Sequence, residues 1–100
     1  MLNAHALFLS IAAKFEKTFK DTHSGYVMSN PAIEYRGRAF AYFKNDSMII
    51  KMSNNSPELY GIRGFRQGKL MNRSQQHWYE IPAYYKSDWE EIGRAELLRI

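Results

Sequence analysis

The chain has 100 residues, of which 45% are apolar and 24% charged, and it contains no cysteine. That length suffices for one domain with a single modest core, and the absence of cysteine excludes disulfides, thiolate nucleophiles and cysteine-ligated metals. The apolar start of the chain is interrupted by His5 and Ser10. It is far shorter than the ~20 apolar residues that a membrane helix needs, so we expect by default a cytoplasmic protein with no membrane association.

The net charge of +4 is unevenly distributed along the chain. Residues 74–100 contain three basic and five acidic side chains, whereas residues 61–73 contain basic side chains and no acidic one. The basic residues of this 61–73 loop are Arg63, Arg66, Lys69 and Arg73. Such a local excess is what a site for phosphate or for an acidic partner requires. A solvated loop whose cations pair with the acidic C-terminal helix explains the same pattern, and both interpretations stay open.

Apolar residues recur at three- and four-residue steps between Leu2 and Lys20, which predicts an amphipathic helix there. The residues of this stripe are Phe8, Ile11, Ala12, Phe15 and Phe19. We expect the helix to end before Gly25, the residue best able to leave the helical region.

Shorter spacings and β-forming residues follow the helix. We expect a short strand near Tyr26–Met28 and then two hairpins. The first hairpin turns at Arg36-Gly37, where glycine supplies a positive φ. The second turns within the sequence KNDS, residues 44–47, which contains two good turn formers.

The second half of the chain predicts two helices and two strands. Ser56 and Pro57 mark the start of a short middle helix. Phe65 and the residues 77–81 predict two further strands. Ser87 and Glu90 have the spacing of a capping box, which opens a C-terminal helix. We expect Trp89, Ile92 and Leu97 to face inward from that helix.

Strands grouped between helices and joined by hairpins predict an α+β fold. We expect two layers, with an antiparallel sheet of about five strands, N- and C-terminal helices and a short middle helix. The chain shows no repeat, linker or low-complexity tract. Residues 1–100 are therefore expected to form a single domain.

The sequence RGRAFAYF, residues 36–43, matches most of a signature of RNA-recognition domains. In those domains a strand and a long helix precede the signature. Here only about ten residues separate the strand near Tyr26 from Arg38, which is too few for a helix and both its turns. We therefore exclude that fold.

The same segment predicts a strand with aromatic rings on both faces. Strict alternation places Phe40 and Tyr42 on one face and Ala39, Ala41 and Phe43 on the other. Helices in a two-layer domain cover only one face of the sheet. The other face then packs its rings at the edge of water or docks a partner, which makes Phe40 and Tyr42 a candidate interface.

No motif indicates catalysis, a metal or a cofactor. GIRG, residues 61–64, matches the backbone clamp of KH domains, but only a short helix precedes it. GFRQGKL, residues 64–70, lacks the glycine and the Ser or Thr of a phosphate-binding loop. None of the three histidines has a second ligand at metal-binding spacing. We expect a protein that is not an enzyme and needs no cofactor.

The order and spacing of several segments resemble the TfoX N-terminal domain family and the related MmcQ/YjbR-like proteins. The matching features are Gly37-Arg38, Phe40-Ala41, Lys51, Gly64-Phe65 and the strand from Trp78 to Pro82. The resemblance covers roughly residues 25–98. It implies a small α+β domain similar to secretion-chaperone-like folds, with no established catalytic residues. TfoX proteins regulate competence for DNA uptake and carry a second domain, so we carry over the fold and no functional site.

Two hypotheses of function follow. The first is a binding or regulatory module that acts through protein contacts, as a homodimer or with another protein, using the open sheet face or the 61–73 loop. The alternative is nucleic-acid binding through the four cations of that loop, aided by Arg36 and Arg38. Counterion release would make such binding strongly dependent on salt.

Overall fold

The fold is described from a computed structural model that covers residues 3–52, 66–67 (backbone only) and 78–100. Its first element is helix α1 (Ala4–Thr18). The side chain of Asn3 caps this helix, because its Oδ1 accepts a hydrogen bond of 2.7 Å from the N–H of Ala6. The predicted apolar stripe is confirmed, and its buried members are Phe8, Ile11, Ala12 and Phe15.

Helix α1 ends earlier than the sequence suggested. Phe19 is already extended, with φ of −112°, and Asp21 takes a positive φ of 63°. Asp21 therefore makes the turn that we expected near Gly25. Gly25 instead lies inside strand β1 (Thr22–Val27), which begins four residues before the predicted strand.

The strands form one antiparallel sheet in the order β1-β2-β3-β4-β6-β5. The remaining strands are β2 (Asn30–Tyr35), β3 (Arg38–Lys44), β4 (Ser47–Lys51), β5 (Arg66–Gln67) and β6 (Trp78–Pro82). The α+β class is thus confirmed, and the sheet has six strands rather than about five. The predicted middle helix falls outside the described residues.

Three successive hairpins connect the first four strands through two-residue turns. Their turn residues, which all have positive φ, are Met28-Ser29, Arg36-Gly37 and Asn45-Asp46. Positive φ at both positions is the signature of a type I′ turn, whose twist matches that of the paired strands. The second and third turns were predicted, but the first was missed because methionine and serine are unusual at such positions.

The C-terminal segment begins with the 3₁₀ helix η2 (Ala83–Asp88) and continues into α3 (Trp89–Leu97). The predicted capping box at Ser87 is wrong, because Asp88 directly precedes α3 and no side chain caps this helix. The preceding 3₁₀ turn replaces the cap, since the N–H of Trp89 bonds to the C=O of Lys86. The inward positions of Trp89, Ile92 and Leu97 are confirmed.

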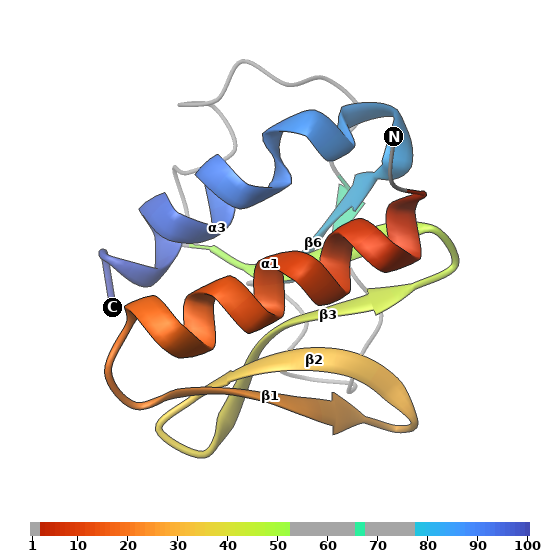
Figure 1. The fold of residues 1–100 in the computed structure, drawn as a ribbon. Helices are drawn as coiled ribbons and strands as arrows, with labels where there is room; N and C mark the ends of the chain where they lie inside the picture. Colours follow the sequence, from red (N-terminus) through yellow and green to blue (C-terminus); the bar gives the residue numbers. More distant parts are fainter. Residues whose placement is uncertain (1–2, 53–65, 68–77) are drawn as a thin grey trace.

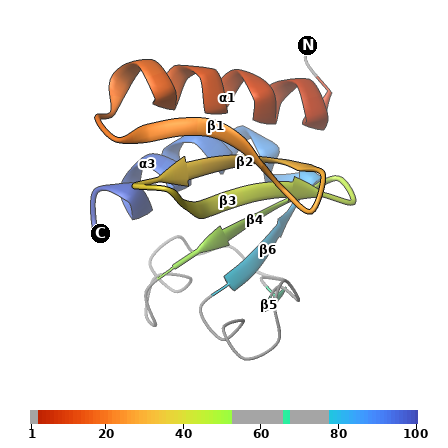
Figure 2. The same ribbon diagram turned by 90° about the horizontal axis from the view of Figure 1, so that it is seen from below.

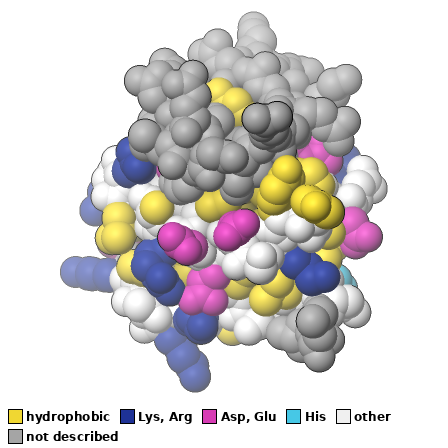
Figure 3. Space-filling model, turned by 90° about the horizontal axis from the view of Figure 1, so that it is seen from above, with side chains coloured by type: hydrophobic (Ala, Val, Ile, Leu, Met, Phe, Trp, Pro, Cys, Tyr) yellow, Lys and Arg dark blue, Asp and Glu magenta, His cyan; other side chains and the backbone are white. Residues whose placement is uncertain are grey.

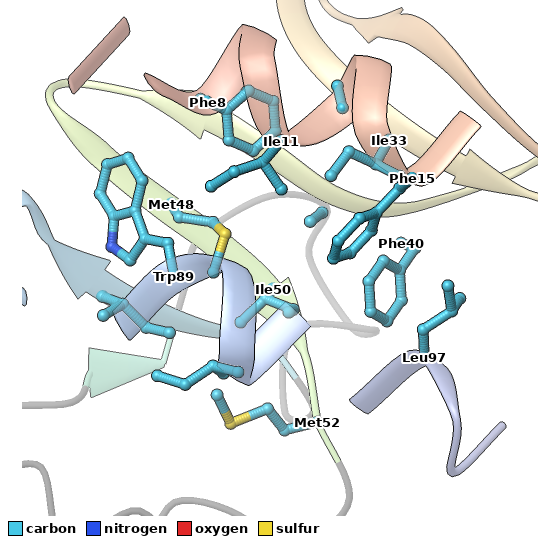
Figure 4. Packing of buried hydrophobic residues seen from close by; sticks show 14 of the residues in the cluster. Phe8, Ile11, Phe15, Ile33, Phe40, Met48, Ile50, Met52, Trp89 and Leu97 are labelled. Carbon is cyan, nitrogen blue, oxygen red and sulfur yellow. The ribbon is translucent and has the colours of Figure 1, made fainter. Parts of the chain in front are cut away.

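Helices α1 and α3 lie side by side over one face of the sheet, so the described residues form two layers (Figures 1 and 2). Between the layers the side chains of α1, α3 and the central strands form the main core, which we call the helix-side core (Figure 4). Phe8, Phe15 and Trp89 are completely buried there. Each such side chain contributes roughly 1.5–3 kcal/mol through the apolar area that it removes from water.

Strand β3 contains an irregularity that changes which face its side chains reach. Ala41 pairs with Ile33 and Ala39 pairs with Glu34, so Phe40 is the extra residue of a β-bulge. Phe40 consequently joins Ala41 in the helix-side core, whereas Tyr42 lies on the opposite face. The prediction that Phe40 and Tyr42 share a face is therefore wrong, because it assumed unbroken alternation.

Candidate anion-binding site

Three strand ends meet at one end of the sheet. Strand β2 ends at Tyr35, β3 begins at Arg38, and β4 ends at Lys51. Neighbouring antiparallel strands run in opposite directions, so these ends lie side by side. A pocket of about 310 Å³ opens there, which we call the basic pocket. It is lined by Tyr35, Arg36, Arg38, Ala39, Phe40, Lys51 and Ile100.

The turn between β2 and β3 fixes the position of Arg36. Its backbone N–H donates a 2.9 Å hydrogen bond to the C=O of Asp21, and its Nε lies 3.7 Å from Oδ2 of the same residue. The guanidinium carbon also lies 5.2 Å from the ring centroid of Tyr35, a cation–π distance. Because it is held against two neighbours, the Arg36 cation is oriented at the rim before any ligand arrives.

The other two cations of the pocket differ from Arg36. Arg38 and Lys51 are both exposed, and neither forms an ion pair with another described residue. Because no described carboxylate pairs with either cation, both are available, within this part of the chain, for an incoming anion. The pocket therefore combines one anchored cation with two available ones.

The floor of the pocket is apolar. Phe40, brought to this side by the bulge, is 2% exposed, and Ala39 and Tyr35 lie beside it. A low-polarity floor strengthens the attraction between a bound anion and the cations at its rim. The volume lies at the low end of the range for small-molecule sites. The pocket thus suits one carboxylate or phosphate group with a short apolar neighbour.

The structure brings together only some of the predicted anion contacts. Arg36 and Arg38 both line the basic pocket, whereas Lys51 was not predicted. A sequence signal for Lys51 existed, because a lysine directly after the apolar run of residues 48–50 marks a strand end. It was missed because only the sheet topology shows that this end adjoins the β2–β3 turn.

Of the predicted 61–73 loop, only the backbone of residues 66–67 belongs to the described part of the chain. The backbone of Arg66 lies on β5, in register with Glu80 of β6. Strand β5 is separated from β3 by β6 and β4 in the sheet order. Arg63, Lys69 and Arg73 lie outside the described residues.

The candidate interface residues Phe40 and Tyr42 are both only 2% exposed. Phe40 packs in the helix-side core, and Tyr42 packs with Trp78 on the opposite face, with ring centroids 5.8 Å apart. A docking partner would reach neither ring without a rearrangement of the chain. Burial, and then the nearby Glu80 carboxylate, raise the pKa of Tyr42 above its ordinary value of 10.0.

Three other described cations form ion pairs with carboxylates. Lys14 and Arg94 both contact Glu90, at 3.1 and 2.8 Å, and Arg99 contacts Glu96 at 3.3 Å. Figure 3 shows basic and acidic side chains intermixed on one face of the molecule, with no continuous basic track among its described residues.

In the described part of the chain, no group of three or more His, Cys, Asp or Glu side chains is placed to hold a metal ion. No helix in that part has the length and apolarity needed to cross a lipid bilayer.

Comparisons with known proteins give no relatives for this chain. No protein-family model, no curated protein and no solved structure matches it. The resemblance to TfoX N-terminal domains therefore stays a prediction from the order of the sequence segments.

Proposed function

We propose that this chain is a non-enzymatic binding module that recognises an acidic segment of a protein partner through the basic pocket. The observation that carries the proposal is the convergence of Arg36, Arg38 and Lys51 on one recess with an apolar floor. A regulatory role and a cytoplasmic location, the latter expected only by default, stay predictions from the sequence.

The geometry favours a protein carboxylate over a nucleic-acid backbone. A duplex or single strand presents phosphates in a row and is held by a series of cations along a groove. The pocket instead gathers its three cations around about 310 Å³. Lys14, Arg94 and Arg99 are already paired with glutamates, which reduces their value as phosphate contacts.

Nucleic-acid binding remains the second candidate, because the four cations of the 61–73 loop are an uncompensated positive run. It makes a distinct prediction about salt. The logarithm of its affinity for duplex DNA should fall with the logarithm of salt concentration, by about 0.9 per phosphate contacted. Binding of a single anionic group in the basic pocket would give a much smaller fall of affinity with salt concentration.

The experiment compares three fluorescein-labelled probes by anisotropy: a ten-residue poly-glutamate peptide, a 20-nucleotide single strand and a 20-base-pair duplex. The double variant Arg38→Gln/Lys51→Gln should weaken peptide binding by about tenfold or more, since hydrogen bonds to charged groups contribute about 1.5–3 kcal/mol each. Lys17→Gln/Lys44→Gln is the matched control, because it removes two exposed charges that do not line the pocket.

Equal losses in the two double variants would mean that only net charge matters, which would contradict the pocket. Tighter binding of the duplex or single strand than of the peptide would favour the second candidate. In that case, replacing Arg63, Arg66, Lys69 and Arg73 by glutamate should abolish binding, while the pocket variant should retain most of it.

A further inference from the structure

We propose that the outer edge of strand β1 pairs with the same edge of a second copy of this chain, which makes one continuous sheet across a two-fold axis at Ser24. This inference does not depend on the proposed function. It uses different residues, since no residue of β1 lines the basic pocket.

Strand β1 is an edge strand, and its outer backbone edge pairs with no other described strand. The side chains of His23 and Ser24 reach Glu16 of α1, at 3.6 and 3.3 Å. The strand stands first in the sheet order, and it forms the lower margin of the sheet in Figure 1. The view from below in Figure 2 shows the strand unobstructed. An edge of this kind presents unpaired N–H and C=O groups that another strand can pair with.

The register fixes which backbone groups face outward. Antiparallel ladders alternate between residues bonded to the neighbouring strand and residues that point away from it. The hydrogen bond from Arg36 N–H to Asp21 C=O shows that the backbone of Asp21 points toward the β2 side. The two-residue turn after Val27 makes Val27 point the same way, so every second residue from Asp21 to Val27 bonds toward β2. Thr22, Ser24 and Tyr26 consequently direct their N–H and C=O groups away from β2.

The sequence of this edge lacks the features that normally prevent pairing. Natural edge strands are short, or carry charges, proline or bulges. Strand β1, with the sequence THSGYV, has six residues, no Lys, Arg, Asp, Glu or Pro, and an unbroken register with β2. Strand β5, at the opposite edge, has two residues and includes Arg66.

Exposed apolar side chains gather at the same edge. Tyr26 is 73% exposed, and Met28, in the adjoining turn, is 71% exposed. Tyrosine and methionine are enriched at protein interfaces. Met28 also has a φ of 50°, which is unfavourable for a side chain of this kind. Both side chains are therefore placed where a paired strand would partly cover them.

Charge selects a second copy as the occupant and fixes its register. The Glu34 carboxyl group lies over Gly25, where a Cβ atom would be 2.7 Å from the Cδ of Glu34. With the two-fold axis at Ser24, Gly25 faces His23 of the partner subunit. Since Nδ1 of His23 lies 3.6 Å from Oε2 of Glu16 in its own chain, only the other ring nitrogen, Nε2, can face Glu34 across the axis. An axis at Gly25 would instead bring two Glu34 carboxylates together and be disfavoured.

The register with the axis at Ser24 uses all the outward-facing groups. Ser24 pairs with Ser24 of the partner subunit, and Thr22 pairs with Tyr26 of the partner subunit. This gives about six backbone hydrogen bonds across the axis. The copy therefore matches the edge in length, hydrogen bonding and charge.

A crosslinking experiment tests the axis directly, because the chain has no native cysteine. Hydrogen-bonded residues that face each other across antiparallel strands have Cα atoms about 5.5 Å apart, within the range of a disulfide. Ser24→Cys should therefore form a disulfide-linked dimer as its main product under mild oxidation. Ser87→Cys is the matched control, because Ser87 is also exposed but lies on η2. Equal crosslinking of the two variants would overturn the proposal.

Sedimentation velocity from 5 µM to 1 mM provides the second readout. The unmodified chain should show a concentration-dependent dimer. Ser24→Pro should weaken its association at least tenfold, because proline removes an outward N–H without breaking a bond to β2. The same change removes the exposed 3.3 Å hydrogen bond from Ser24 Oγ to Oε1 of Glu16. The circular dichroism and melting curve of Ser24→Pro should stay close to those of the unmodified chain, which separates lost pairing from lost folding.

A chain that stays monomeric up to 1 mM would overturn the proposal, and the edge would then be open to a strand from another protein. A dimer that Ser24→Pro does not weaken would also overturn it. Peptide binding to the basic pocket should be unchanged in Ser24→Pro. A failure of this inference is therefore distinguishable from a failure of the proposed function.

Discussion

The two faces of the sheet are both buried at their centres, but by different kinds of side chain. The face under α1 and α3 is covered by a large cluster of hydrophobic residues, which includes Phe8, Phe15 and Trp89. On the opposite face the buried cluster consists of Ala32, Tyr42, Ile49 and Trp78. Polar groups adjoin this second cluster, since Ser47 donates a 2.9 Å hydrogen bond to Glu80.

The difference shows how one strand serves two environments. The bulge in β3 moves Phe40 to the helix side and leaves Tyr42 as the large ring on the other side. A phenylalanine has no polar atom and suits the apolar core, whereas a tyrosine keeps one polar end. We expect substitutions on the helix side to cost mainly packing energy, and substitutions on the opposite face to change polar interactions as well.

The largest expected effect is on the helix side. Trp89→Ala should lower the free energy of unfolding by about 3–5 kcal/mol, because it removes a completely buried ring and leaves a cavity. Leu98→Ala is the control at the end of the same segment, since Leu98 is 68% exposed, and it should change stability by less than about 0.5 kcal/mol. Urea denaturation measures both. A small loss for Trp89→Ala would show that the helix-side core is not the main source of stability.

An intermediate effect is expected on the opposite face. Ser47 is 4% exposed, and Ser47→Ala removes its hydrogen bond to Glu80. The free energy of unfolding should fall by about 1 kcal/mol, which is the usual net contribution of one hydrogen bond. The fall should be slightly larger if anything, because the acceptor here is a carboxylate. A double-mutant cycle with Glu80→Gln checks this value by urea denaturation. A coupling energy near zero would show that this bond does not stabilise the opposite face.

The smallest expected effect at neutral pH is that of Tyr42→Phe, which should change stability by about 0.5 kcal/mol or less. Its signature appears at alkaline pH. The folded chain holds the pKa of Tyr42 above the ordinary value of 10.0, so the unfolded chain loses this proton first and stability falls as pH rises from about 10 through the folded pKa. Thermal melts between pH 8 and 11 should show a shallower decline for Tyr42→Phe. Parallel curves would contradict the raised pKa.

Local sequence patterns predicted much of the fold. The apolar stripe of α1, the turns at Arg36-Gly37 and Asn45-Asp46, and the α+β class follow from helical periodicity and turn preferences. The start of β1 and the first turn were missed, because Asp21 and Met28 adopt positive φ without being glycine. Such conformations are imposed by the pairing of strands rather than by the residue itself.

The candidate site was only half predictable. Arg36 and Arg38 stand next to a recognisable turn, and their positive charge was apparent in the sequence. Lys51 joins them from another strand, and Phe40 forms the floor only because a bulge changes its direction. Neither fact has a local signal, since both depend on which strands are neighbours and in what register.

The sequence alone determined that the chain has helices near both ends, where two of the three described hairpin turns lie and that it carries an excess of positive charge, because these properties depend on residues close together along the chain. The tertiary structure decided which face each ring of β3 occupies, which cations share a pocket and which strand forms a bare edge. These depend on strand order and register, which arise from contacts between residues far apart in the sequence.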